Sequence, residues 1–330
     1  MKKFFSLLSI LGIVLLSSCS KEQYDKFDNL TPFTLTASVG DLTKTSYTDD
    51  AGILKVQWDA NEIITLVKTQ NDLITAMYNL TSVGEAGRTI AEFTGSVDLT
   101  GENVKFIAVY PPVSDPTASS SKVAMPEGCT YIINNVSLGQ GYVTNTVNAT
   151  KYIYQVANND PSHLKYIDAM YGEVSATSTS AALTNLDKIT SVLKLVLTLP
   201  EGAVGKQARS VSFELSNSPS GYNYLHSVNY WIKASSSKNR GSSTYSYAAH
   251  MYLGNASEGF VIPDDRTITL YLPLIYARNW ENGATETITL NVSYNDGGVI
   301  KTDSYSKSVV NTQEYVLQQG YIYTISATLE

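Results

Sequence analysis

The 330-residue sequence has only two cysteines, Cys19 and Cys129, and only three histidines. Two cysteines are too few for a thiolate metal cluster, and an intramolecular disulfide would require both of them. His163, His226 and His250 do not lie at metal-ligand spacing from one another or from a cysteine, and we expect surface or partly packed imidazoles. The sequence therefore predicts no metal, no cofactor, and a stability that comes from hydrophobic cores.

Basic charge and catalytic motifs are also scarce. The chain has 23 Lys and Arg against 30 Asp and Glu, a net charge of -7 and a pI near 5.1. This balance argues against a nucleic-acid partner, because no basic surface is available to displace phosphate counterions. The sequence contains no nucleophile elbow, zinc-protease motif, P-loop or dinucleotide fingerprint. We therefore do not expect an enzyme.

Long hydrophobic runs are absent, and the short one at the N-terminus is typical of a secretory signal. Two lysines precede the apolar run Phe4 to Leu16, which is shorter than the roughly 20 residues that a membrane helix needs. Leu16-Ser17-Ser18-Cys19 then resembles a lipobox. We expect residues 1–18 to be a signal peptide, Cys19 to be the lipid attachment site, and residues 19–31 to be a flexible lipidated tether.

Strand patterns dominate the remainder. Apolar residues alternate with polar ones in many short segments, a period of two that places the apolar set on one face of a sheet. Such segments are Phe33 to Val39, Leu54 to Trp58, Leu193 to Leu199, Ile268 to Leu274, Ile288 to Tyr294 and Tyr321 to Leu329. Asn295-Asp296-Gly297-Gly298 predicts a hairpin between Leu290–Tyr294 and Val299–Tyr305. Asn185 to Thr190 is the one segment in which a short helix is expected.

This pattern predicts an all-β protein of antiparallel β-sandwiches. The small, polar stretch Ser175 to Ala182 is the best candidate for a domain boundary. We therefore expect an N-terminal β-sandwich domain over residues 32–178 and a C-terminal β-sandwich domain over residues 179–330.

One group of aromatic residues could face a ligand. These residues surround the polar loop Ser235 to Ser243 and are Tyr222, Tyr224, Tyr230, Trp231, Tyr245, Tyr247 and Tyr252. Tyrosine combines an apolar face with a polar tip, which suits both sugar rings and protein partners. The other interpretation is that these are ordinary strand aromatics, because tyrosine is enriched in sheets.

Four blocks in order resemble the fimbrillin family, the Bacteroidetes-type lipoproteins that include type V pilus subunits. The blocks are Lys44-Thr45-Ser46-Tyr47, Leu54 to Ile63 around Trp58, Ile167 to Gly172, and Leu317 to Ile325. Lys44 stands where many members have arginine, and Asn61-Glu62 replaces the commoner Gly-Asp. The resemblance implies two tandem transthyretin-like domains and a lipoprotein of the outer membrane, at the cell surface or in a fimbrium. It also implies assembly by strand exchange in members that polymerise.

Strand exchange gives Phe33 to Val39 a specific role. A protease would remove this first strand, and the groove would then accept a strand from a neighbouring subunit. Lys44 is the basic residue suited to a trypsin-like cut in the loop that follows; alternatively it is a solvated loop residue. The sequence stops at Thr328-Leu329-Glu330, within the strand that a donor extension would follow, so we expect a tip, minor or non-polymerising component.

Three interpretations of function therefore remain. The first is an adhesive or structural fimbrial component, with other fimbrial subunits, or host or bacterial surface glycans or proteins, as partners. The second is a surface glycan-binding lipoprotein of a saccharide-uptake system, in which the tether and the aromatic group would serve equally well. The third and most distant is a secreted hydrolase.

Overall fold

The computed structural model describes an all-β chain and so confirms the predicted class. The residues it describes are 29–38, 46–50, 53–71, 73–102, 104–112, 122–124, 142–145, 150–166, 169–174, 178–184, 186–222, 226–227, 230–233, 236–242, 245–254, 259–275 and 279–330. Helix in these ranges is limited to two 3-10 turns, η1 (Ser162–Tyr166) and η2 (Glu201–Ala203). No helix in the described ranges is both long and apolar enough to cross a membrane.

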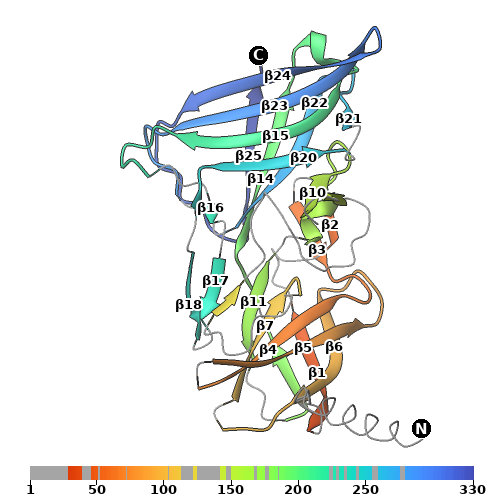
Figure 1. Cartoon of the computed structure of the whole chain (residues 1–330), viewed down its shortest axis with the longest axis vertical. Coiled ribbons are helices and arrows are strands. Elements are labelled where there is room, and N and C mark those ends of the chain that lie inside the picture. The colour runs from red at the N-terminus through yellow and green to blue at the C-terminus, as the bar shows by residue number, and fades with distance from the viewer. Residues whose placement is uncertain are drawn as a thin grey trace, which may run out of the picture.

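The first large sheet has eight strands in the order β12-β1-β6-β5-β4-β7-β11-β13 (Figure 1). Its strands are β1 (Leu30–Ser38), β4 (Ile63–Gln70), β5 (Leu73–Val83), β6 (Ile90–Asp98), β7 (Val104–Tyr110), β11 (Met170–Val174), β12 (Ser180–Leu183) and β13 (Asp187–Lys188). All neighbours in it are antiparallel except β1 and β12. The N-terminal strand is therefore an interior strand of this sheet.

This sheet curls around its own hydrophobic core. Buried residues on β1, β4, β6, β7, β11 and β12 form one cluster, which also contains Trp58. The curl brings the β12 side of the sheet back to β11, where a Cβ added to Gly172 would lie 2.8 Å from Cδ1 of Leu183. Only glycine fits at this position without displacing the leucine.

The second large sheet has seven strands, in the order β24-β23-β15-β20-β10-β9 with β21 paired to β15. Its strands are β9 (Tyr142–Asn145), β10 (Thr150–Gln155), β15 (Gln207–Ser216), β20 (Ala248–Leu253), β21 (Phe260–Val261), β23 (Thr285–Asp296) and β24 (Val299–Val310). A three-stranded sheet, β22-β14-β25, accompanies it and comprises β14 (Thr190–Thr198), β22 (Thr267–Ile275) and β25 (Ile322–Thr328).

These two sheets enclose a second core. Leu193, Leu195 and Leu197 of β14 and Phe213 of β15 belong to one buried cluster. Tyr323, Ile325 and Ala327 of β25 pack against it. The alternation that predicted these strands therefore corresponds to the side that each strand turns toward the core.

Three small sheets complete the described fold. They pair β2 (Ser46–Asp50) with β3 (Ile53–Gln57), β16 (His226–Ser227) with β19 (Tyr245–Ser246), and β18 (Ser236–Ser242) with β17 (Tyr230–Lys233) and β8 (Lys122–Ala124). β12 and β13 join the sheet of β1, and β10 pairs with β20, so strand pairs cross the predicted boundary in both directions. The division into two domains at residues 178 and 179 stays a prediction.

The hairpin prediction is confirmed. β23 and β24 pair through twelve register positions, ending at Asp296 opposite Val299. Gly297 and Gly298 form the two-residue turn with φ values of 60° and 89°, as hairpin turns with a matching twist require.

The short helix expected over Asn185 to Thr190 is wrong in the described part of that segment. Asp187 and Lys188 instead form β13, which pairs with Tyr171 and Met170, and Thr190 already begins β14. Pairing with β11 outweighs the weak local preference for helix.

Candidate functional site: the seat of the first strand

β1 is held on both edges. It pairs antiparallel with β6 from Leu30 opposite Asp98 to Ser38 opposite Ile90, and parallel with β12 through four positions from Thr34 to Ala37. Beyond the ladder, the Thr34 amide donates to the Thr179 carbonyl at 3.0 Å, and the Ser38 hydroxyl donates to the Thr184 carbonyl. Removing β1 would therefore leave two facing strands with unpaired backbone groups.

The inward side chains of β1 form part of the core. Phe33, Leu35 and Ala37 are fully buried, while Thr34 and Thr36 between them are only half-buried. The Phe33 ring stacks on Phe106 of β7, with 6.4 Å between centroids. This alternation supplies three apolar contacts at every second residue, the spacing at which a replacement strand would have to present its own apolar side chains.

Trp58 lies deep in the same core. Its indole makes T-shaped contacts with the rings of Phe93 and Tyr110, with centroid distances of 4.9 Å and 5.4 Å. Its backbone forms an isolated bridge with Arg88, in which the Trp58 amide donates to the Arg88 carbonyl at 2.9 Å. None of these contacts involves a residue of β1, although β1 contributes its own side chains to the same core.

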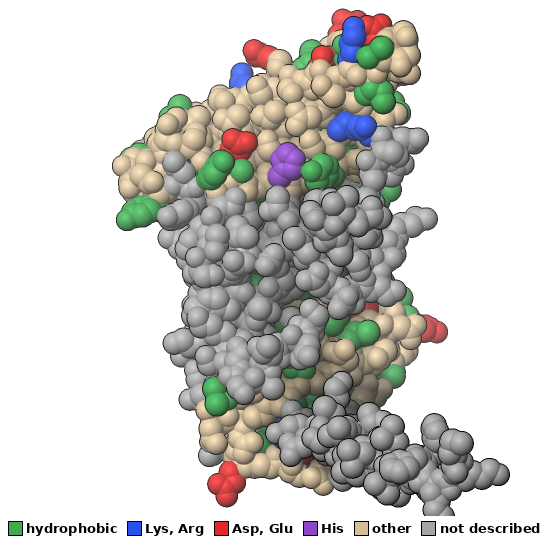
Figure 2. Space-filling model, in the orientation of Figure 1, with side chains coloured by type: hydrophobic (Ala, Val, Ile, Leu, Met, Phe, Trp, Pro, Cys, Tyr) green, Lys and Arg blue, Asp and Glu red, His purple; other side chains and the backbone are tan. Residues whose placement is uncertain are grey.

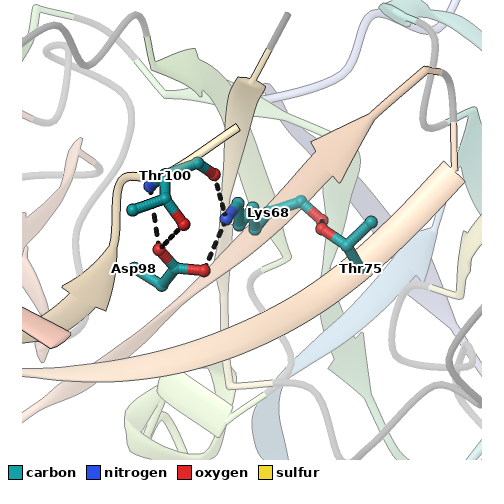
Figure 3. A network of polar contacts seen from close by, with 4 residues as sticks. All are labelled: Lys68, Thr75, Asp98 and Thr100. Atoms are coloured by element: carbon teal, nitrogen blue, oxygen red, sulfur yellow. Dashed lines mark hydrogen bonds and ion pairs between the residues drawn. The ribbon is translucent and has the colours of Figure 1, made fainter. Parts of the chain in front are cut away.

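A polar latch closes the end of the core where β1 begins (Figure 3). Lys68 of β4 is 4% exposed, and its Nζ donates to Asp98 Oδ2 at 2.8 Å and to the Thr100 carbonyl at 2.7 Å. The other Asp98 oxygen accepts from the amide and hydroxyl of Thr100. Because Asp98 is also the register partner of Leu30, the latch fixes the residue against which the first strand starts.

Electrostatics favour the charged form of this latch. Partial burial opposes ionisation of Asp98, but the hydrogen bonds from Lys68 and Thr100 outweigh it and hold the carboxyl pKa below its usual value. The neighbouring Tyr78 has a raised pKa, chiefly because of burial and further because of the Asp98 charge. The latch is therefore an ion pair at neutral pH, beside a neutral phenol.

Burial of the β1 side chains between β6 and β12 contributes to the stability of the sheet, and the contribution can be approximated. Burying a Phe or Leu side chain contributes about 1.5–3 kcal/mol, so Phe33 and Leu35 together contribute about 3–6 kcal/mol. Every backbone group of β6 and β12 left unpaired and buried would cost about 1–3 kcal/mol more. The pairing and burial of β1 therefore contribute substantially to the stability of this sheet.

Most residues that the sequence predicts to act on the first strand lie outside the described ranges. Cys19, the signal peptide, residues 19–28 of the tether, and Lys44 lie outside the described residues, as does Val39 at the end of the first strand. Their lipidation and processing stay predictions. The contribution of β6, β12 and the Lys68–Asp98 latch was not foreseen, because an alternating pattern does not reveal which strand pairs with which.

The predicted aromatic group is spread over several elements. Tyr222 and Tyr247 are well exposed, at 65% and 60%, and Tyr252 is exposed on β20. Tyr230 and Trp231 belong to β17 and Tyr245 to β19, which lie in different small sheets, while Tyr224 lies outside the described residues. A ligand site built from this group stays a prediction.

The histidines and acids show no metal site within the described ranges. No group of three or more His, Cys, Asp or Glu side chains there could hold a metal ion. His163 is fully buried, against the expectation of a surface or partly packed ring, and His250 is half-buried on β20. Asp264 and Asp265 lie in a turn, and Asp265 Oδ1 accepts from the Thr267 amide at 3.0 Å.

No protein-family model matches the sequence, and no curated protein matches it. Among solved structures, a proposed cell adhesion protein from Bacteroides uniformis overlaps with a TM-score of 0.45 at 13% identity, covering 91% of this chain and 94% of that one. A fimbrial protein from Bacteroides ovatus overlaps with a TM-score of 0.31 at 13% identity, covering 91% of this chain and 50% of that one. The tip fimbrial protein of Porphyromonas gingivalis, with a C-terminal truncation, gives 0.31 at 11% identity, covering 83% and 81%. With TM-scores below 0.5, these overlaps support no functional argument.

Proposed function

We propose that this chain is a surface lipoprotein of a fimbria-like assembly, anchored in the outer membrane through Cys19 and joined to a neighbouring subunit by exchange of its first strand. The observation that carries the proposal is the position of β1. An N-terminal segment forms an interior strand, paired on both edges and buried along one side. Interior strands are ordinarily tied into a sheet by short connections, whereas this one could leave as a unit after a single cut at Lys44.

Within this assembly we propose a tip, minor or non-polymerising component. The last strand is occupied within its own fold. β25 pairs with β14 over seven positions, and Leu329 is buried with its amide donating to the Thr198 carbonyl at 2.9 Å. The amides and carbonyls of Glu330 and Ser306 bond reciprocally at 3.2 Å. Residues 322–330 are therefore used within their own fold and are not free to be lent to another subunit.

The experiment is limited digestion of the full chain with a trypsin-like protease, followed by intact mass and N-terminal sequencing. The expected first product begins at Thr45, because Lys44 follows the exchangeable strand, and a Lys44→Gln variant should resist this cut. Cleaved protein should accept strands from other subunits without forming long homopolymers. A first cut after Arg88, or long homopolymers of the cleaved chain, would contradict the proposal.

A further inference from the structure

The outward face of the seven-stranded sheet carries an unusual polar pattern. Its four long strands turn alternate residues into the core and the intervening residues outward. The register places the outward residues in straight rows across β20, β15, β23 and β24. In Figure 2, few acidic or basic side chains interrupt the middle of the described part of this sheet.

Two of these rows bond internally. In one, the Ser304 hydroxyl donates to Asn291 Oδ1 at 2.7 Å, and Asn291 Nδ2 donates to the Ser210 hydroxyl at 3.0 Å. In the other, the hydroxyls of Thr287 and Ser308 lie 2.9 Å apart. The side chains of these rows are therefore held in place by their own neighbours.

The row between them does not bond internally. It consists of His250, Ser212, Thr289 and Ser306, which are register neighbours on the four strands; we call it the outer row. Among the described residues, none of these four side chains has a hydrogen-bond partner. Ser212 is only 7% exposed and yet stands on the outward face. Its hydroxyl oxygen is not among the fully buried polar atoms that lack a partner, so solvent reaches it and a ligand could take the place of that solvent.

Aromatic surface adjoins the outer row at its β20 end. Tyr252 is 46% exposed and meets the His250 ring edge-on, with 5.7 Å between centroids. Burial lowers the pKa of His250, and the charge of Glu214 opposes this only in part. The imidazole is then neutral at pH 7 and offers both a donor and an acceptor.

We propose that the outer row binds a neutral glycan, with the sugar chain lying across the four strands and a ring face packing against Tyr252. This rests on the proposed surface role, and it gives that role a partner of defined chemistry. Sugar hydroxyls both donate and accept, as do the hydroxyls of Ser212, Thr289 and Ser306. Four strands span about 14 Å, which is room for several sugar units.

The chemistry of the outer row disfavours both an anionic polymer and a protein partner. The outer row has no cation, and the chain is acidic overall, so an anionic polymer would find no counter-charge. Short hydroxyl side chains offer little apolar area, whereas stable protein interfaces bury an apolar centre with aromatic anchors. A neutral, hydroxyl-rich polymer requires neither a counter-charge nor an apolar centre with aromatic anchors.

The experiment is affinity electrophoresis of the uncut full chain in native gels that contain one polysaccharide each. The neutral probes are an α-glucan, a β-glucan and a mannan, and the charged probes are polygalacturonate and heparin. We expect retardation by at least one neutral probe and by neither charged one. The Ser212→Ala/Thr289→Val variant should bind that probe about thirtyfold more weakly, since two hydrogen bonds of about 1 kcal/mol each are lost.

The matched control is Ser326→Ala/Thr324→Val, which makes the same changes at exposed positions of β25. The single variant Ser306→Ala, at an exposed position of the outer row, should also weaken binding, and thermal unfolding verifies that every variant is folded. Retardation by charged probes only, by no neutral probe, or equal loss in both double variants would overturn the proposal. So would loss in Tyr230→Ala/Trp231→Ala with the outer-row variant unchanged. Strand release at Lys44 is measured separately, so a failure here leaves the proposed function standing.

Discussion

Nε2 of His163 lies 2.7 Å from the backbone carbonyl of Tyr271, and it joins η1 to the outer edge of β22. A carbonyl can only accept, so Nε2 must carry the proton. The contact is one part of a larger arrangement in which side chains of residues 155–163 take the place of a paired strand along β22. We call this segment the edge clamp.

Amide side chains supply most of the edge clamp. Gln155 donates to the Thr269 carbonyl at 2.8 Å and accepts from the Tyr271 amide at 2.9 Å. Asn158 donates to the Thr267 carbonyl at 3.1 Å and accepts from the Thr269 amide at 2.7 Å. An edge strand with free backbone groups invites aggregation, and the edge clamp satisfies those groups without adding a strand.

Protonation of His163 should weaken the edge clamp in acid. Burial lowers its pKa from 6.5 to about 4, against the opposing influence of its hydrogen bond to Tyr271 and of the Asp160 charge. Since the folded pKa lies below the unfolded one, the unfolded chain binds the proton first as the pH falls. The stabilisation is complete above pH 6.5 and is lost between pH 6.5 and 4, a total of about 3 kcal/mol.

The measurement is chemical unfolding of wild type and of His163→Gln at pH 6.5 and 4.5. Wild type should lose about 2 kcal/mol more than the variant over this interval. Carboxylates titrate in both proteins and cancel in the comparison. Parallel losses in the two proteins would show that His163 does not titrate as its burial requires.

Removing the amide of Gln155 should destabilise the fold strongly. Gln155 is fully buried, and Gln155→Leu would leave the Tyr271 amide without its acceptor and remove one of the donors to the Thr269 carbonyl. Each buried polar group left unpaired costs about 1–3 kcal/mol, so we expect a loss of about 2–4 kcal/mol in the free energy of unfolding. Gln313→Leu, at an exposed position, is the control and should change stability by less than about 0.5 kcal/mol. Similar effects at the two sites would mean that the edge clamp does not bear on stability.

The Lys68–Asp98 latch gives a prediction about charge. Lys68→Met keeps the apolar stem but leaves the Asp98 carboxylate without its cation. Breaking a buried pair costs about 3–5 kcal/mol, and because the Asp98 side chain is 25% exposed we expect about 2–3 kcal/mol. The control Lys307→Met removes an exposed ion pair with Glu330 and should cost less than about 1 kcal/mol. Urea unfolding of both variants provides the comparison, and equal losses would refute a structural role for the latch.

The sequence predicts where the strands lie along the chain better than it predicts which strands pair with one another. Alternation locates β1, β14, β22, β23 and β25, because each has one side on a core and one side nearer to solvent. It cannot reveal that β1 lies between β6 and β12, because register depends on which strands meet after folding. The outer row is hidden for the same reason, since its four residues are far apart in sequence.

Two errors have identifiable causes. The sequence predicts a short helix over the segment that contains Asp187 and Lys188, yet pairing with β11 decides their conformation. The sequence predicts a surface or partly packed ring for His163, yet the ring is fully buried and only its Nε2 bonds, to the Tyr271 carbonyl. The adjacent Asn158 and Asn159 are the sequence feature that could have indicated side chains bonding to backbone groups in this segment.

The central claim is that the first strand can be exchanged, and it can be tested directly by strand replacement. Protein cut after Lys44 is mixed in mild denaturant with excess fluorescent peptide of residues 30–38, and the complex is weighed by native mass spectrometry. We expect one peptide to replace the resident strand, and a Leu35→Asp peptide not to bind, because Leu35 is fully buried in the core. Retention of the resident strand against any excess, or equal binding of the two peptides, would contradict the account.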